Sequence, residues 1–488
     1  MESTGMVTIT KAEYEQLLAT KSEVAYLKFQ LAELKRMIFG AKSERYVTPD
    51  TDQTSLFEVP TEQPIEQPKE EITYTRNKSQ EKKQPLRLEL PSHLPRRDEV
   101  IEPEDLPLNA KKIGEAITEV IEYSPASAYV RRIIRPKYII DQNDEQTHIA
   151  VAPLPCLPIP KGNAGASMLA HILVSKFVDH LPFYRQRQIF KRQDLEIAES
   201  TLGGWFNAGC NLLRPLYDVL KIKILEGWYL MADETPIAVL TQDKPGATHK
   251  GYHWVYYDPV NKLVLFDYRK TRGREGPDEL LKDYRGFLQT DGYTAYNDLK
   301  NHENITLLAC MAHARRKFEH AQENNPMLAG EALKMFQLLY DIERIARDTK
   351  LSTEEIKELR QKESKWILNQ MEAWLKEQII LSLPKSAIGS AIAYTLKLWP
   401  RLVRYIDDGH FYIDNNLIEN SIRPVALGRK NYLFAGSHEA AQQAAVIYSI
   451  LGTCKIQGIE PFNYLTKILS VIPDYPANQL HTLLPGQK

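Results

Sequence analysis

Apolar residues repeat every seven positions in residues 8–46 and predict one long helix there. The positions that carry the repeat are Leu17, Val24, Leu31 and Ile38, with Leu27 and Leu34 between them. The pattern suits a coiled coil, and it suits equally a single amphipathic helix packed on its own protein. Residues 47–90 are instead rich in Pro, Glu, Gln, Thr and Lys. Because such a segment buries too little apolar surface to offset its ordering entropy, it predicts a flexible linker.

Short runs of alternating β-branched and polar residues predict a strand-built unit over residues 91–160, with one strand at 129–140. Helical spacing follows over residues 161–225. The expected helices are 164–177, 183–192 and 200–219, the last with Ser200 as its N-cap. A helix, a turn and a capped helix favour a helix-turn-helix motif, although a plain helical bundle has the same pattern. The cations of this region that would face DNA phosphates are Arg185, Arg187, Lys191 and Arg192.

Two acids each follow an apolar run in the middle of the chain. The run at 229–232 ends on Asp233, and Pro236 follows. This pattern predicts a buried strand that breaks at the proline and delivers one carboxylate to the edge of a sheet. Asp291 has a similar setting, because it follows the expected strand Phe287-Leu-Gln-Thr290 and precedes a glycine turn. Acids at strand ends and turns are common, so neither residue alone defines a site.

The other patterns in residues 226–320 predict how these two acids are connected. Aromatic and β-branched stretches at 251–258 and 263–268 predict antiparallel neighbours of the first strand. A short helix is expected at 276–284 and a further buried strand at 305–310. This order fits a mixed α/β sheet with acids at one edge.

Long helical patterns then occupy residues 321–405 and show no chemistry. The expected helices are 328–349, 353–378 and 385–406. Because they separate the strands from residues 406–440, they predict an all-α insertion that divides the sheet domain into two parts. Residues 441–488 predict a helical tail, in which Cys454 is expected to be buried.

A third acid, Glu419, lies in residues 414–424, which predict a short capped helix. Asp414 competes with it as a ligand, but capping alone explains an acid so near the helix start. Three carboxylates on separate elements provide the oxygen ligands that a pair of Mg²⁺ ions takes in proteins. Arg423 shares a helix face with Glu419, and it either pairs with that residue or contacts a phosphate.

Two groups of cations lie beside these elements. The first follows the strand at 305–310 and consists of His313, Arg315, Arg316 and Lys317. Four cations on one helical turn repel one another, which favours an anionic partner such as a phosphate; a solvated helix face is the alternative. The second group, Arg429 and Lys430, is expected in a turn bounded by Gly428 and suits contacts with a DNA backbone.

Composition narrows the class of protein. The chain has 488 residues, too many for one compact core, and carries 62 Lys and Arg against 63 Asp and Glu. A DNA-binding face must therefore concentrate its cations on one side. The four cysteines form no Cys-x-x-Cys pair, which argues against a disulfide framework. We expect a soluble cytoplasmic protein, because the sequence contains neither a signal-peptide pattern nor an apolar run of membrane-spanning length.

Four motifs occur in the order Ala-Asp-Glu-Thr-Pro (232–236), Thr-Asp-Gly-Tyr (290–293), Asp-Asn-Asn-Leu-Ile-Glu-Asn-Ser-Ile-Arg-Pro (414–424) and Gly-Arg-Lys-Asn-Tyr-Leu-Phe-Ala-Gly-Ser (428–437). With them the chain resembles the transposases of the insertion-sequence 66 family over nearly its whole length. The resemblance implies a multidomain α/β and α protein with a ribonuclease-H-like catalytic domain. It also implies that Asp233, Asp291 and Glu419 are the catalytic ligands of two Mg²⁺ ions, with Mn²⁺ as an alternative.

The resemblance further implies that the partners are transposon ends and target DNA, a second copy of the chain and accessory proteins of the same element. Relatives have a zinc module with two cysteine pairs in the region of residues 91–160. The matching stretches 106–111 and 139–144 contain no cysteine, so we expect no zinc.

The sequence therefore predicts a DNA transposase of the bacterial nucleoid that cleaves a phosphodiester bond and transfers the 3′-hydroxyl to target DNA. The rival interpretation is a catalytically silent DNA-binding protein derived from a transposase.

Overall fold

The computed structural model describes residues 131, 133–134, 137–143, 146–151, 156–160, 162–241, 246–296, 299 and 304–486. The expected N-terminal helix (8–46), the linker (47–90) and most of the strand-built unit lie outside this part and stay predictions. Of that unit the structure describes the antiparallel strands β1 (Lys137–Asn143) and β2 (Gln146–Val151). The strand expected at 129–140 thus begins later, at Lys137.

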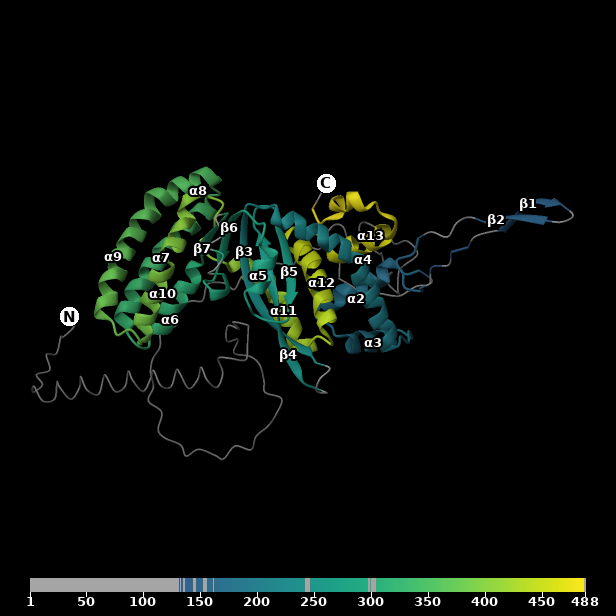
Figure 1. The fold of residues 1–488 in the computed structure, drawn as a ribbon, viewed down its shortest axis with the longest axis horizontal. Helices are drawn as coiled ribbons and strands as arrows, with labels where there is room; N and C mark the ends of the chain where they lie inside the picture. Colours follow the sequence, from purple (N-terminus) through teal and green to yellow (C-terminus); the bar gives the residue numbers. More distant parts are fainter. Residues whose placement is uncertain are drawn as a thin grey trace, which may run out of the picture. The chain divides into compact units, whose positions relative to one another are not determined.

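A five-stranded mixed sheet forms the core of the described chain (Figure 1). Its strands are β3 (Tyr229–Leu240), β4 (Thr248–Asp258), β5 (Leu263–Arg269), β6 (Gly286–Thr290) and β7 (Ile305–Ala309). In the spatial order β5-β4-β3-β6-β7, the first three are antiparallel neighbours, whereas β6 and β7 run parallel to β3. The predicted mixed α/β sheet and its antiparallel hairpins are confirmed.

The sequence predicted a strand that breaks at Pro236, but the central strand β3 continues through this residue. β6 pairs with β3 only from Tyr229 to Met231, so no strand of the sheet lies alongside β3 on that side beyond this point. Proline lacks an N–H group, and it is tolerated in a strand where no ladder hydrogen bond is needed. β3 therefore continues to Leu240, and Asp233 lies inside a strand rather than at its end.

The C-terminal part of the chain fills the open side of β3. Ala435 N donates to Ala238 O at 2.8 Å, and Leu240 N donates to Ala435 O at 2.9 Å. Arg429 donates from Nη1 to Pro236 O at 2.8 Å. Segments far apart in sequence thus meet along one edge of this strand.

Helix α12 (His438–Ile456) covers the outer edge of β5. The hydroxyls of Ser449 and Thr453 accept hydrogen bonds from Phe266 N at 2.8 Å and from Val264 N at 3.2 Å. Gly452 permits this close approach, because a Cβ there would lie 2.7 Å from Val264 Cγ1. A strand edge with unpaired N–H groups would offer a template for other chains, and α12 removes two of these groups.

The helices before the sheet are α2 (Ala166–Phe177), α3 (Phe183–Lys191) and α4 (Glu199–Leu225), and the tail adds α13 (Pro461–Val471). The starts of α2, α3 and α4 were predicted to within a few residues, whereas the tail was predicted only as helical. The prediction of Ser200 as an N-cap is wrong, because α4 already begins at Glu199 and Ala198 is its N-cap. No helix in the described part of the chain has the length and apolar character needed to cross a membrane.

The helices between β7 and the end of the sheet domain are α6 (Met311–Ala321), α7 (Pro326–Asp348), α8 (Thr353–Leu359), α9 (Lys365–Leu381) and α10 (Ala387–Leu402). α10 packs on α6 and on β7 (Figure 1). The single helix expected at 353–378 is divided by a π-helical turn, Arg360–Ser364. Such turns are rare and frequently mark functional positions in a helix.

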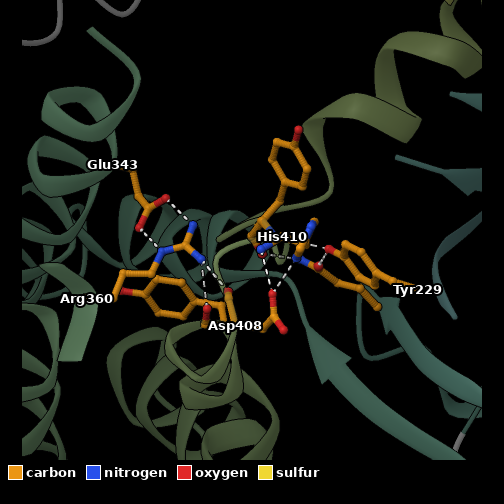
Figure 2. A network of polar contacts seen from close by, with 8 residues as sticks. Tyr229, Glu343, Arg360, Asp408 and His410 are labelled. Carbon is orange, nitrogen blue, oxygen red and sulfur yellow. Dashed lines mark hydrogen bonds and ion pairs between the residues drawn. The ribbon is translucent and has the colours of Figure 1, made fainter. Parts of the chain in front are cut away.

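Arg360 sits at this π-helical turn and joins three parts of the helical insertion (Figure 2). Its side chain is buried, and it donates to the Glu343 carboxylate from Nε at 2.8 Å and from Nη2 at 2.6 Å. Its Nη1 donates to the carbonyls of Tyr405 at 3.0 Å and Asp408 at 2.8 Å. The insertion therefore fixes the place from which the chain returns to the sheet.

The returning segment, residues 408–415, is anchored to the sheet side by side chains of β3 and β6. Tyr412 N donates to Tyr229 Oη at 3.1 Å, and Gln289 Nε2 donates to Tyr412 O at 3.0 Å (Figure 2). Asn415 Nδ2 donates to Ala232 O at 3.4 Å. Helix α11 (Asn416–Tyr432), which carries Glu419, begins directly after these contacts.

We predict that Arg360→Gln destabilises the folded protein by about 3–5 kcal/mol, because it leaves the Glu343 carboxylate without its buried partner. The matched control is Arg344→Gln. Arg344 pairs with Asp341 at 2.8 Å on an exposed helix surface, and such pairs contribute under about 1 kcal/mol. Thermal unfolding of the full chain measures both. Equal losses in the two variants would contradict the anchoring role of Arg360.

Candidate active site

Asp233 projects from β3 beyond the last residue that pairs with β6. Its Oδ1 accepts a hydrogen bond from Glu234 N at 2.8 Å. Burial raises the pKa of Asp233 to about 8, and the nearby carboxylates of Glu234, Asp291 and Glu419 add to the increase. A carboxyl group in such surroundings requires a proton or a cation.

Asp291 follows the C-terminal end of β6 in a tight turn. Its Oδ1 accepts from Tyr293 N at 2.8 Å, and its carbonyl accepts from Tyr394 Oη of α10 at 2.6 Å. Gly292 has φ +87°, a left-handed conformation that favours glycine. A Cβ there would also lie 2.6 Å from Leu398 Cδ1. The turn is therefore stabilised by its own glycine and the Tyr293 N–H group, and by contacts with α10 of the helical insertion.

Glu419 lies in the first turn of α11 and faces α6. Its carboxylate accepts two hydrogen bonds from Arg316 Nη2, at 3.1 Å to Oε1 and 2.9 Å to Oε2. Arg316 Nη1 also lies 3.4 Å from His313 Nε2 on the same helix. Of the two alternatives for Arg423, the pair with Glu419 is not present, because Glu419 pairs with Arg316 and Arg423 is exposed.

Asp291, in the turn after β6, and Glu419, on α11, therefore act electrostatically on Asp233 of β3. All their donor atoms are oxygens, and the raised pKa of Asp233 reflects first its burial and then the negative charge of the neighbouring carboxylates. These are the properties of a site for a hard divalent cation. In the described residues, however, no three His, Cys, Asp or Glu side chains lie close enough to hold a metal ion together. Glu419, the third acid that the sequence predicted as a ligand, is instead bound to Arg316.

The sequence prediction missed three residues at the rim of this site. Arg272 donates from Nε to Glu234 Oε1 at 2.8 Å, and its guanidinium lies 4.0 Å from the ring centroid of Tyr293. Glu234 Oε2 is buried without a hydrogen-bond partner among the described residues. Burial raises the pKa of Glu234, and the Arg272 hydrogen bond opposes the increase. Glu234 stands in the quoted motif at 232–236, whereas Arg272 lies in a loop without a distinctive pattern.

The cations after β7 are less free for an external anion than the sequence predicted. Arg315 pairs with Glu319 at 2.8 Å, and Arg316 pairs with Glu419. Lys317 is exposed and lies 5.4 Å from the ring centroid of Tyr394. Burial lowers the pKa of His313, which favours its neutral form. The helix start at Met311 is confirmed, but two of its four cations already have partners within the protein.

The prediction of a turn at Arg429 and Lys430 is wrong, because α11 continues through Pro424 to Tyr432. Burial of the helix face that includes Val425 and Gly428 outweighs the hydrogen bond that a proline removes. Arg429 donates to Thr235 Oγ1 at 3.1 Å and to Pro236 O, so it holds β3. Lys430 is exposed in the last turn of α11.

Basic residues of α3 adjoin the end of α11. Arg185 Nη1 donates to Asn431 Oδ1 at 3.0 Å. The exposed cations of this surface are Arg185, Arg187, Lys191 and Arg192. One of them, Lys191, lies 3.9 Å from Glu196. The four cysteines are unbonded, as expected, and burial raises the pKa of Cys454 to about 12.

Family models match most of the chain. The model described as "Transposase IS66 family" matches residues 161–443. The models "Transposase C of IS166 homeodomain" and "IS66 C-terminal element" match residues 26–98 and 449–485. These matches define the class of protein as a transposase. The chain belongs to the insertion-sequence 66 family, as its motifs predicted.

Similar proteins occur in Sinorhizobium fredii (strain NBRC 101917 / NGR234). The uncharacterized protein y4jD is 34% identical, and the match covers 94% of each chain. The uncharacterized protein y4hP is 29% identical over 95% of this chain and 89% of its own length. Among solved structures, the Drosophila P element transposase strand transfer complex matches with a TM-score of 0.32 and 11% identity, over 62% of this chain and 94% of that chain. A likeness of this size carries no argument about function.

We predict that Asp233→Asn stabilises the folded protein at neutral pH in the presence of EDTA. The folded protein keeps a proton on Asp233 up to a pKa of about 8, against 3.8 for the ordinary group. Stability from this group is therefore complete below about pH 4 and is lost as the pH rises towards 8. The amide removes this loss, so the variant should gain about 2–4 kcal/mol near pH 7 and little near pH 4.

Melting temperatures of the full chain across this pH range measure the effect. Asp283→Asn is the control, because Asp283 is an exposed acid on a turn near the sheet. A variant that is no more stable than the control near pH 7 would contradict the crowding of carboxylates around Asp233.

Proposed function

We propose that this protein is a DNA transposase that hydrolyses a phosphodiester bond at each end of its element and joins the freed 3′-hydroxyl to target DNA. One observation carries the proposal. The carboxylates of Asp291 and Glu419 help to raise the pKa of the buried Asp233. This cluster of acids lies in a member of a transposase family. Three antiparallel strands followed by two parallel ones also support a ribonuclease-H-like catalytic domain.

The three carboxylates would hold divalent cations, Mg²⁺ or Mn²⁺. When bound, a pair of such cations stabilises charge on the phosphate and activates a water or a 3′-hydroxyl. Asp233 and Asp291 each have one oxygen fixed by a backbone N–H group, so their remaining oxygens are oriented in advance. Glu419 comes from α11 and completes the set. The reaction needs no Ser or Tyr nucleophile from the protein.

Exposed cations near this point provide contacts for the DNA backbone. Lys317 lies on α6, the helix of Arg316. Arg423 and Lys430 lie on α11, the helix of Glu419. The Arg185–Asn431 hydrogen bond connects α11 with the basic surface of α3. Phosphate contacts of this kind orient a duplex without reading its sequence.

The rival function is DNA binding without cleavage. It requires no metal, so it leaves the crowding of Asp233, Glu234 and Asp291 without a purpose. Carboxylates that raise one another's pKa cluster at functional sites more often than elsewhere. We therefore favour the enzyme.

Replacing Asp233 or Asp291 by Asn should abolish Mg²⁺-dependent cleavage of a duplex that contains the element's end. A neutral amide is a poor ligand for a hard cation. DNA affinity should stay within a few-fold of wild type, since neither residue contacts the backbone through a positive charge. The Asp283→Asn variant should cleave normally. Cleavage by either site variant at the wild-type rate would contradict the metal assignment.

Arg423→Gln should slow cleavage by roughly ten- to a hundredfold, because a cation beside the scissile phosphate is used most as negative charge develops in the transition state. Affinity for DNA should fall less, with a shallower salt dependence. Lys365→Gln, on exposed α9, is the matched control for the loss of one positive charge. If Arg423→Gln and the control cleave equally fast, Arg423 only covers the surface.

A further inference from the structure

Two residues for which the sequence predicts different ligands are bound to each other. Glu419 would hold a divalent cation, and Arg316 would face the DNA backbone. In the structure Arg316 Nη2 donates to both oxygens of Glu419, at 3.1 and 2.9 Å. Both side chains keep some exposure, 44% for Arg316 and 30% for Glu419, so both can reach other partners.

The pair prevents either residue from serving its ligand. Arg316 donates to both carboxylate oxygens of Glu419, and in this arrangement no three acids among the described residues lie close enough to hold a metal ion together. Arg316 in turn has part of its charge neutralised by Glu419, which weakens its attraction for a phosphate. His313 lies 3.4 Å from Arg316 Nη1 and supports the arginine in this position.

We propose that Arg316 is a positioning residue that closes the metal site until DNA arrives. This inference rests on the proposed function. A backbone phosphate of DNA replaces Glu419 as the partner of Arg316, and Glu419 then turns to the cation held by Asp233 and Asp291. Metal binding and DNA binding thereby favour each other, because each ligand removes one member of the same ion pair.

Linkage gives this device a measurable size. Two ligands that compete with one internal contact increase each other's affinity by the same factor, commonly about 5- to 150-fold. The pair is partly exposed, so a value of about tenfold is expected here. The benefit to the protein is that a hydrolytic centre is assembled only on a substrate.

The first test measures Mn²⁺ affinity of the full chain without DNA, by electron paramagnetic resonance of the free ion. Four proteins form a double-mutant cycle: wild type, Arg316→Gln, Glu419→Gln and the double variant. Arg316→Gln should bind Mn²⁺ about tenfold more tightly than wild type. The same substitution should have a much smaller effect when Gln replaces Glu419, since no ligand remains to be released.

Arg315→Gln controls for charge. Arg315 lies next to Arg316 on α6 but pairs with Glu319, so its loss changes the charge near the site without releasing Glu419. The proposal is overturned if Arg316→Gln tightens Mn²⁺ no more than this control, or if it acts equally with and without Glu419.

The second test measures DNA affinity in EDTA, by fluorescence anisotropy with a random-sequence duplex. Glu419→Gln should bind the duplex about tenfold more tightly than wild type, because it frees Arg316 for a phosphate. The gain should vanish in the double variant. A gain that persists without Arg316 comes from the lost negative charge alone and overturns the proposal.

These outcomes separate the inference from the function on which it rests. If the effects of the Arg316 and Glu419 substitutions simply add, while cleavage still depends on Asp233, the proposed role of Arg316 is excluded. The transposase assignment then stays intact. A protein in which Asp233→Asn changes neither Mn²⁺ affinity nor cleavage would remove the metal site itself, and the proposed role of Arg316 with it.

Discussion

The candidate site is governed by the burial of the Asp233 carboxyl group within β3, close to other carboxylates that repel it. Asp233 lies next to Glu234 in sequence and near Asp291 in space, and burial gives this negative charge little water to screen it. Burying several negatively charged carboxylates close together lowers the stability of the folded protein, unless cations nearby compensate their charge. Arg272 holds Glu234 and Arg316 holds Glu419, which leaves the space near Asp233 and Asp291 as the one least compensated. In the proposed function, that imbalance would give the site its affinity for a divalent cation.

The helical insertion is the support of this site rather than an appendage. It fixes the turn of Asp291 through Tyr394 and Leu398 of α10. Through the buried Arg360 it also fixes the carbonyls of Tyr405 and Asp408, from which the chain returns to the sheet and starts α11. Asp233 thus lies on a strand, Asp291 lies in the turn after a strand, and Glu419 lies on a helix whose start is set by the insertion. Small shifts in the insertion would therefore change the position of Glu419.

Local pattern predicted much of this arrangement. Apolar runs and turns predicted every strand of the main sheet and the association of Asp233 and Asp291 with two of these strands. Buried strands and glycine turns have strong local signals. Contacts between distant segments were beyond such reasoning. Pro236 is tolerated only because β6 leaves β3 after Met231, and Arg429 serves the backbone of β3 only because α11 continues beyond Pro424. The partner of Glu419 is likewise 103 residues away on α6 and not four residues away at Arg423.

Family motifs led to the proposal of Asp233, Asp291 and Glu419 as metal ligands, but they could not reveal which partners these side chains have in the structure. The same three acids can be bound to a cation or turned towards arginines, and sequence is identical in both states. Geometry decides between them. In the structure Asp233 and Asp291 are held by backbone groups, whereas Glu419 is held by a side chain that can exchange its partner.

The most direct test of this account is the position of a bound ion. Crystals of the full chain with a DNA duplex and Mn²⁺ would give an anomalous difference peak at the metal. The account predicts a peak at roughly 2.0–2.3 Å from carboxylate oxygens of both Asp233 and Asp291, the range expected for a hard divalent ion, with Glu419 turned away from Arg316. A well-occupied peak elsewhere, or DNA bound across the site with no ion between Asp233 and Asp291, would contradict it.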